Sequence, residues 1–152
     1  MNADGFTVVE LLVTVAVIGI LAVLGYPYVA TYLQTAQTRA GAEELATVLN
    51  GARQLAIARN QNVCVSLSSN KAVYTIGVSN TCGGGTTFVG TNTASDGTMA
   101  LNNTMQISAA TASVVFSSLG AAVQAGTYTV RNPTTGGTMS VVVSSAGRVT
   151  IQ

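Results

Sequence analysis

The sequence lacks most of the side chains that carry enzyme chemistry. Its 152 residues include no histidine and no tryptophan, and only 7% of them are charged, with a formal net charge of +1. Histidine is the commonest general base and metal ligand near neutral pH. After Glu44 the only carboxylate is Asp96, so the C-terminal part cannot assemble an acid–base pair or a catalytic triad. The composition therefore argues against an enzyme, and we expect no cofactor and no metal.

Cysteine is also scarce, since Cys64 and Cys82 are the only two. A zinc site would need further cysteine or histidine ligands, and a nucleophilic cysteine would need a base beside it. In an exported domain the simplest interpretation is a disulfide between these two residues. Closing a loop of this size stabilises a fold by roughly 3 kcal/mol in the chain-entropy model. Two unpaired buried thiols are the alternative.

Charge is missing altogether from one long segment. No charged residue lies between Glu10 and Arg39, and Leu11–Val29 is almost wholly apolar. As a helix this stretch would extend about 28 Å, close to the thickness of a bilayer core of about 30 Å. Glu10 stands at its edge, where a carboxylate is costly without a partner. Because no lysine or arginine precedes Arg39, the nearest cation would be an α-amino group at Phe6, created by cleavage after Gly5.

The segment around Glu10 reads Gly5-Phe6-Thr7-Val8-Val9-Glu10-Leu11-Leu12-Val13. It resembles the N-terminal motif of type IV pilins and type II secretion pseudopilins. The resemblance implies that a prepilin peptidase cuts between Gly5 and Phe6 and methylates the new amino group of Phe6. It also implies that Glu10 pairs with the N-terminal amine of a neighbouring subunit, and that Pro27 distorts the helix. The leader departs from the family pattern because residues 1–5 contain no lysine or arginine.

Two other interpretations of the apolar segment are weaker. A secretory signal peptide would have a basic N-terminal region and a small-residue cleavage site. Here the charge before the apolar run is acidic, and Tyr26-Pro27-Tyr28 follows the run. A plain single-span anchor would explain the length of the segment but gives Glu10 no role.

The helical pattern continues beyond Pro27 to Arg59. Arg39 and Glu43 stand four positions apart, which favours an ion pair on a helix surface. The apolar residues of this half recur every three or four positions, as expected for one buried face of a helix. They are Leu45, Val48, Leu49, Ala52, Leu55 and Ala56.

After Asn62 the apolar period changes to two, which indicates strands. Val63–Leu67 and Ala72–Val78 are predicted to pair as a hairpin across the polar residues 68–71. A Gly-rich and Thr-rich loop is expected from Ser79 to Asn103. Its three consecutive glycines lack the following lysine of a phosphate-binding loop. Further strands are predicted at Thr104–Ser108, Ser113–Ser117, Tyr128–Arg131, Met139–Ser144 and Arg148–Ile151.

These elements predict an α+β fold of the pilin type, with a long N-terminal helix, transmembrane and then amphipathic, packed on an antiparallel sheet. The expected organisation is a leader at residues 1–5, a transmembrane and assembly helix at 6–29, its amphipathic half at 30–61 and a globular β domain at 62–152.

The C-terminal half contains the stretches Val114–Gly120 and Val141–Val149. These are similar to minor pilins and pseudopilins of the GspH/FimT type, and a major pilin of another kind is the alternative. Some FimT-like pilins bind DNA through a Gly-Arg-x-Arg segment. The matching stretch here is Gly147-Arg148-Val149-Thr150, which keeps one of the two arginines. Since DNA affinity grows with the number of phosphates neutralised, Arg148 is a weak candidate for DNA contact, with Arg131 and Lys71 as possible helpers. A solvated charge at the end of a strand is the simpler interpretation of Arg148.

The expected function is therefore that of a structural, minor subunit of a type IV pilus or of a type II secretion pseudopilus. The expected partners are other pilin subunits, the prepilin peptidase, and the bacterial inner membrane with its assembly platform. The globular domain would lie in the periplasm before assembly into a filament. The alternative function is DNA capture by a minor pilin of the natural-transformation machinery.

Overall fold

The structure, a computed structural model, describes residues 6–101, 106–110 and 113–152. Its contacts divide the chain into two compact units, Met1–Gln34 and Thr35–Gln152. One helix, α1 (Val8–Arg59), contributes to both units. The first unit is the N-terminal part of α1, and the second holds the rest of α1 and every strand.

The large apolar side chains in the N-terminal part of α1 are exposed, from Val8 to Leu33. A helix that is apolar on all sides has no polar face to turn to water, so it needs a lipid or protein environment. Among the described residues, no single helix is both long and apolar enough to cross a membrane. The consecutive segments Val8–Leu24 and Tyr28–Arg59 meet that criterion, by length and composition, only when taken together.

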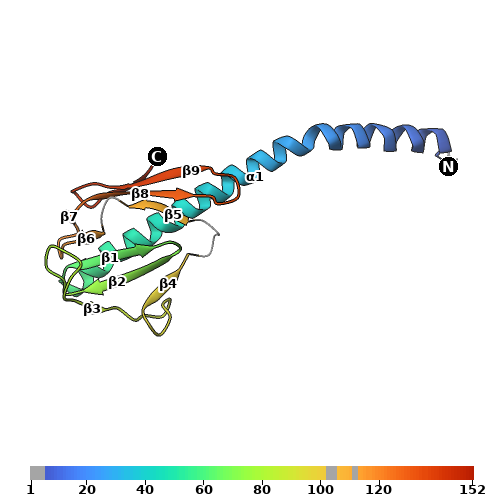
Figure 1. Ribbon diagram of the computed structural model, residues 1–152. Helices are drawn as coiled ribbons and strands as arrows, with labels where there is room; N and C mark the ends of the chain where they lie inside the picture. Colours follow the sequence, from blue (N-terminus) through green and yellow to red (C-terminus); the bar gives the residue numbers. More distant parts are fainter. Residues whose placement is uncertain (1–5, 102–105, 111–112) are drawn as a thin grey trace, which may run out of the picture. The chain divides into compact units, whose positions relative to one another are not determined.

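The second unit contains two antiparallel sheets, which Figure 1 shows gathered around the second half of α1. The larger has the strand order β3-β2-β1-β6-β7, with β4 also paired to β2, and the smaller has the order β10-β9-β8-β5. The larger sheet comprises β1 (Val63–Ser68), β2 (Lys71–Ile76), β3 (Thr86–Thr87), β4 (Thr98–Ala100), β6 (Val114–Phe116) and β7 (Ala122–Gln124). The smaller comprises β5 (Gln106–Ala110), β8 (Gly126–Arg131), β9 (Thr138–Val143) and β10 (Val149–Ile151).

One hydrophobic core joins the amphipathic half of α1 to both sheets. It contains fully buried side chains from the helix, such as Leu45 and Leu49, and from the strands, such as Phe116 and Tyr128. Burying a side chain of this size contributes about 1.5–3 kcal/mol. The backbone N–H of Val114 donates to the Tyr128 hydroxyl oxygen over 2.9 Å, which links β6 of one sheet to β8 of the other.

A second tyrosine fixes the larger sheet to the helix. The Tyr74 hydroxyl of β2 donates a hydrogen bond to the backbone carbonyl of Val48. A Cβ atom at Gly51 would stand only 3.1 Å from this hydroxyl. The glycine thus leaves the space through which Tyr74 reaches the helix backbone.

The predicted fold class is confirmed, although the strands form two sheets. The buried helix face and the Arg39–Glu43 ion pair, at 2.9 Å, are also as predicted. Helix α1 begins at Val8 rather than Phe6. The register Val63↔Ile76 to Ser68↔Lys71 confirms the predicted hairpin.

The later strands differ in detail from the prediction. The strands expected around Ser113–Ser117, Tyr128–Arg131, Met139–Ser144 and Arg148–Ile151 are present with shifted ends. Of the strand expected at Thr104–Ser108, the first two residues lie outside the described part, and β5 begins at Gln106. Strand β7 was not predicted, and the expected loop Ser79–Asn103 contains the short strands β3 and β4.

Candidate functional site

The N-terminus of α1 is closed by a reciprocal pair of hydrogen bonds between Thr7 and Glu10. The backbone N–H of Glu10 donates to the Thr7 hydroxyl oxygen over 3.3 Å, and the backbone N–H of Thr7 donates to Glu10 Oε2 over 3.1 Å. The Thr7 hydroxyl also donates to the same Oε2 over 2.9 Å. This is a capping box, in which Thr7 is the N-cap and Glu10 the third helical residue. It explains why the helix begins at Val8.

This arrangement was not predicted, although the sequence carries its signal. A Thr followed three residues later by a Glu, just before an apolar run, is a known mark of a helix start. Both Thr7 bonds end on Oε2 of Glu10, and no bond to Oε1 is found among the described residues. The carboxylate is therefore oriented within its own chain while one oxygen is left open.

The other N-terminal predictions are not settled by the structure. Phe6 precedes the helix, and 74% of its surface is exposed. Gly5 lies outside the described residues, so the cleavage bond between Gly5 and Phe6 cannot be placed. Pro27 lies within the backbone of α1, but its side chain is outside the described part. Cleavage, methylation and helix distortion therefore stay predictions.

The two cysteines form the disulfide that the sequence suggested as its simplest interpretation. Cys64 of β1 is bonded to Cys82, with their Cα atoms 5.3 Å apart. Cys64 is buried with Val78 and Val115 in a small second cluster, against which Cys82 packs. The bridge ties the start of the Gly-rich segment to the central strand of the larger sheet.

Two turns of related sequence pack against each other beside the last turns of α1. They are Ser117-Ser118-Leu119-Gly120, between β6 and β7, and Ser144-Ser145-Ala146-Gly147, between β9 and β10. Each ends in a glycine at positive φ, 80° for Gly120 and 76° for Gly147. A Cβ atom on Gly147 would collide with the carbonyl oxygen of Gly120, so only glycine fits this contact.

The helix takes part in the same contact. Arg53 Nε donates to the carbonyl oxygen of Gly120 over 2.8 Å. The backbone N–H of Ala122 donates to the carbonyl of Ser145 over 3.0 Å. Together these bonds fix both turns to each other and to the last turns of α1.

Arg148 follows the second turn directly and is exposed. The structure does not bring it together with Arg131. Arg131 of β8 is paired with Thr138, the first residue of β9, and β10 begins opposite Val143, the last residue of β9. The two arginines therefore lie near opposite ends of β9, which is about 17 Å long. Lys71 lines a groove elsewhere with Glu44. The arginine that contacts the pair of turns next to Arg148 is instead Arg53, which was not among the predicted residues.

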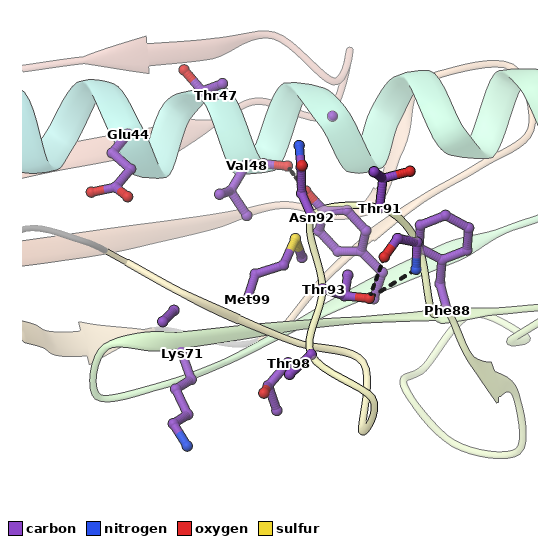
Figure 2. A pocket seen from close by; sticks show the side chains of 15 residues that line it. Glu44, Thr47, Val48, Lys71, Phe88, Thr91, Asn92, Thr93, Thr98 and Met99 are labelled. Atoms are coloured by element: carbon purple, nitrogen blue, oxygen red, sulfur yellow. Dashed lines mark hydrogen bonds between the residues drawn. The ribbon is translucent and has the colours of Figure 1, made fainter.

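The groove of about 960 Å³ lies between the amphipathic half of α1, β2, β4 and the segment that follows β3 (Figure 2). Its lining includes the apolar side chains of Val48, Phe88 and Met99 together with several hydroxyl and amide side chains. The two charged residues that line it are Glu44 and Lys71. Among the described residues there is no cluster of three metal-binding side chains.

Three side chains of the globular unit have shifted pKa values. Burial raises the pKa of Tyr74, under the groove, to about 12, and burial likewise raises that of Tyr128 in the core to about 12. The Thr98 side chain and backbone N–H donate to Asp96 Oδ1 and lower the pKa of that carboxyl. Asp96 thus caps the turn that leads into β4.

The fold is similar to those of solved minor pilins and pseudopilins. The type IV minor pilin FimU of Pseudomonas aeruginosa superposes with a TM-score of 0.54 at 16% identity, covering 80% of this chain and 92% of that one. GspH of Escherichia coli superposes with a TM-score of 0.59 at 15% identity, covering 77% and 88%. The minor pseudopilin EpsH of the Vibrio cholerae type 2 secretion system gives 0.55 at 13% identity, covering 76% and 96%. At these identities the likeness concerns the fold. No curated protein matches the chain.

Two family models match the sequence. The prokaryotic N-terminal methylation motif matches residues 1–26. The model described as type II transport protein GspH matches residues 41–147, which is more than half of the chain. The resemblance to pilins and pseudopilins is thereby confirmed, and the chain belongs to the GspH family of type II transport proteins.

Proposed function

We propose that this protein is a structural, minor subunit of a type IV pilus or type II secretion pseudopilus, and not an enzyme. It would enter the inner membrane as a prepilin, with its globular domain in the periplasm, and join the filament through its N-terminal helix. The observation that carries the proposal is the exposed apolar surface of α1 with an oriented carboxylate at its start.

The apolar surface of this helix needs cover at every stage of assembly. The apolar side chains from Val8 to Leu33 have no cover within the described part of the chain. The membrane would hold them first, and parallel helices of neighbouring subunits would hold them in the filament core. Because lipid is as apolar as these side chains, close packing between helices would stabilise the association, and packing alone does not fix its register.

Glu10 would supply that register. The capping box leaves Oε1 open, so the carboxylate can accept a charge-assisted hydrogen bond from the N-terminal ammonium of Phe6 on a neighbour. In the low dielectric of a helix bundle such a pair is strong, and a misaligned Glu10 would be buried unpaired, which is costly. A subunit would therefore be held at the axial position where its Glu10 pairs with the Phe6 ammonium of a neighbour.

The test compares filament incorporation of Glu10→Ala and Glu10→Gln with that of Glu43→Ala, an exposed carboxylate elsewhere on α1. Both Glu10 variants are expected to insert in the membrane like the unaltered chain but to be lost or disordered in filaments, because neither carries the negative charge that makes the bond to an ammonium charge-assisted. Glu43→Ala is expected to assemble normally. Normal incorporation of Glu10→Ala would overturn the proposed role.

The proposal implies three kinds of partner. They are other pilin-class subunits, the assembly platform in the inner membrane, and a prepilin peptidase that would act between Gly5 and Phe6. The solved relatives are described as a minor pilin and as a minor pseudopilin of a type 2 secretion system, which supports both kinds of filament.

A second candidate function is DNA capture. It rests on the exposed Arg148 and on Arg53, which lies beside the same pair of turns. Two phosphate contacts would give weak, salt-sensitive binding. A duplex DNA mobility shift that is abolished by Arg148→Ala and falls steeply with salt would favour this function over a purely structural one.

A further inference from the structure

The surface around Gly120 combines exposed apolar side chains with arginine. Leu119 is 89% exposed, more than any other large hydrophobic side chain in the described part of the chain. Ile57 is 51% exposed. A Cβ atom on Gly120 would come within 2.9 Å of Ile57 Cδ1 and 3.1 Å of Arg53 Nε. Arg148 is attached to Gly147, which packs on the Gly120 carbonyl. We call Arg53, Ile57, Leu119 and Arg148 the Gly120 surface.

This surface is held rigidly. The turn that carries Leu119 is closed by two bonds, Gly120 N–H to the Ser117 carbonyl at 2.8 Å and Ser117 N–H to the Ala121 carbonyl at 2.7 Å. The Arg53 bond and the glycine contact fix it from both sides. Leu119 therefore cannot fold back onto the core, and it keeps its side chain in water until another molecule covers it. Arginine is one of the residues enriched in binding hot spots, and a rigidly held apolar side chain beside it loses little conformational freedom when a partner covers it.

The charge of the region indicates what would cover it. The unit from Thr35 to Gln152 carries six cationic residues and three carboxylates, Glu43, Glu44 and Asp96. On α1 the carboxylate nearest to Arg53 is Glu44, nine positions earlier, or about 13 Å along the helix. Arg148 makes no side-chain hydrogen bond or ion pair within the described residues, so its charge is open to a partner.

We propose that the Gly120 surface docks a different filament subunit, one that presents an apolar side chain flanked by carboxylates. This inference rests on the proposed function, since it assumes a filament in which such a neighbour exists. A second copy of this chain is a poorer occupant because its globular unit is itself short of carboxylates. DNA is also poorer because its phosphate backbone has no use for a protruding leucine and isoleucine. The geometry makes Leu119 the central anchor and Arg148 the rim charge that selects the partner.

The experiment places a photocrosslinking amino acid at position 119 of the full chain, in cells that assemble the filament. Position 89 is the control, because Val89 is exposed to 56% on the separate segment after β3. Adducts are treated with nuclease and identified by mass spectrometry. We expect position 119 to give an adduct with another pilin-class subunit, at a peptide that contains Asp or Glu beside an apolar residue. Position 89 should give little or none.

Charge reversal then tests the selectivity. Arg148→Glu is expected to lower the yield of the adduct at position 119 by about fivefold or more, because it places like charges together. Arg131→Glu, at the other end of β9, should leave the yield within about twofold, since its charge lies too far away for strong coupling at physiological salt. Both variants change exposed residues, and an intact Cys64–Cys82 disulfide with an unchanged melting temperature shows that each is folded.

Several outcomes would overturn the inference. These are no adduct at position 119, a nuclease-sensitive adduct, an adduct with a second copy of this chain, equal yields at positions 119 and 89, or equal effects of the two charge reversals. If the chain is present in filaments and one of these results is obtained, only the docking inference fails. If the unaltered chain is absent from filaments, the proposed function fails and the docking inference with it.

Discussion

Thr7 holds Glu10 through two hydrogen bonds to one carboxylate oxygen, and Glu10 donates its own N–H to Thr7 in return. The residue that would align neighbouring subunits is thus also the residue that closes the first turn of its own helix. Since the capping bonds use Oε2 alone, alignment and capping can coexist. The Thr7 hydroxyl and Glu10 therefore act as a unit, and Thr7 positions the carboxylate.

Thr7→Ala should weaken filament incorporation less than Glu10→Ala does. It removes the hydroxyl that donates to Oε2 and accepts from the Glu10 N–H, at a cost of about 1 kcal/mol in helix capping, but it leaves the carboxylate itself. Thr7→Ser should assemble normally, because serine caps as well as threonine. The amount of each variant in sheared filaments measures the effect. Equal loss in Thr7→Ala and Thr7→Ser would contradict a capping role.

Gly147→Ala should destabilise the globular unit strongly, whereas Gly136→Ala should not. Both glycines have similar positive φ, 76° and 75°. A Cβ atom at Gly136 meets nothing within 4 Å, whereas at Gly147 it meets the Gly120 backbone. We expect about 1 kcal/mol for the conformational strain alone, and at least about 2 kcal/mol more where the turns must separate. Chemical denaturation measures both, and similar losses in the two variants would refute the packing of the two turns.

Removal of the disulfide should destabilise the globular unit by about 3 kcal/mol. The double variant Cys64→Ser with Cys82→Ser tests this without reducing agents. Because the bridge tethers the Gly-rich segment to β1, the largest gain in amide exchange should fall between Val78 and Phe88. Uniform exchange gains over the whole unit, with no excess in this segment, would contradict a local tether.

Stability should fall as the pH rises from 10 to 12. Tyr74 and Tyr128 have folded-state pKa values raised to about 12 by burial, against about 10 in the unfolded chain. The contribution of each is complete below pH 10 and is lost as the unfolded state releases protons that the folded state keeps. The loss is at most about 2.7 kcal/mol for each tyrosine. Denaturation at several alkaline pH values measures it, and Tyr74→Phe should reduce the slope. A slope that is unchanged in this variant would show that Tyr74 does not titrate as described.

The sequence predicted those parts of the fold that depend on local pattern. The helix face at Leu45–Ala56 and the hairpin Val63–Ile76 follow from periods of 3.6 and 2, which a single chain segment displays by itself. Strands β3 and β4 were not predicted because the polar, Gly-rich segment that contains them shows no alternating apolar pattern. They exist through their pairing with β2.

The candidate site was predictable to a similar degree. The N-terminal motif is contiguous and was recognised from its residues, although its capping box was overlooked. The Gly120 surface joins residues from α1 and from two separate turns, and only the fold brings Arg53 to Gly120 and Gly120 to Gly147. The sequence left open whether Arg131 joins Arg148, and strand register places the two at opposite ends of β9.

The central claim is that this chain is processed and assembled as a pilin-class subunit. The most direct test is the intact mass and N-terminal sequence of the chain coexpressed with a prepilin peptidase. The account predicts a product that begins at N-methylated Phe6. A chain that still begins at Met1 would contradict it, and would instead favour a domain held by an uncleaved N-terminal anchor.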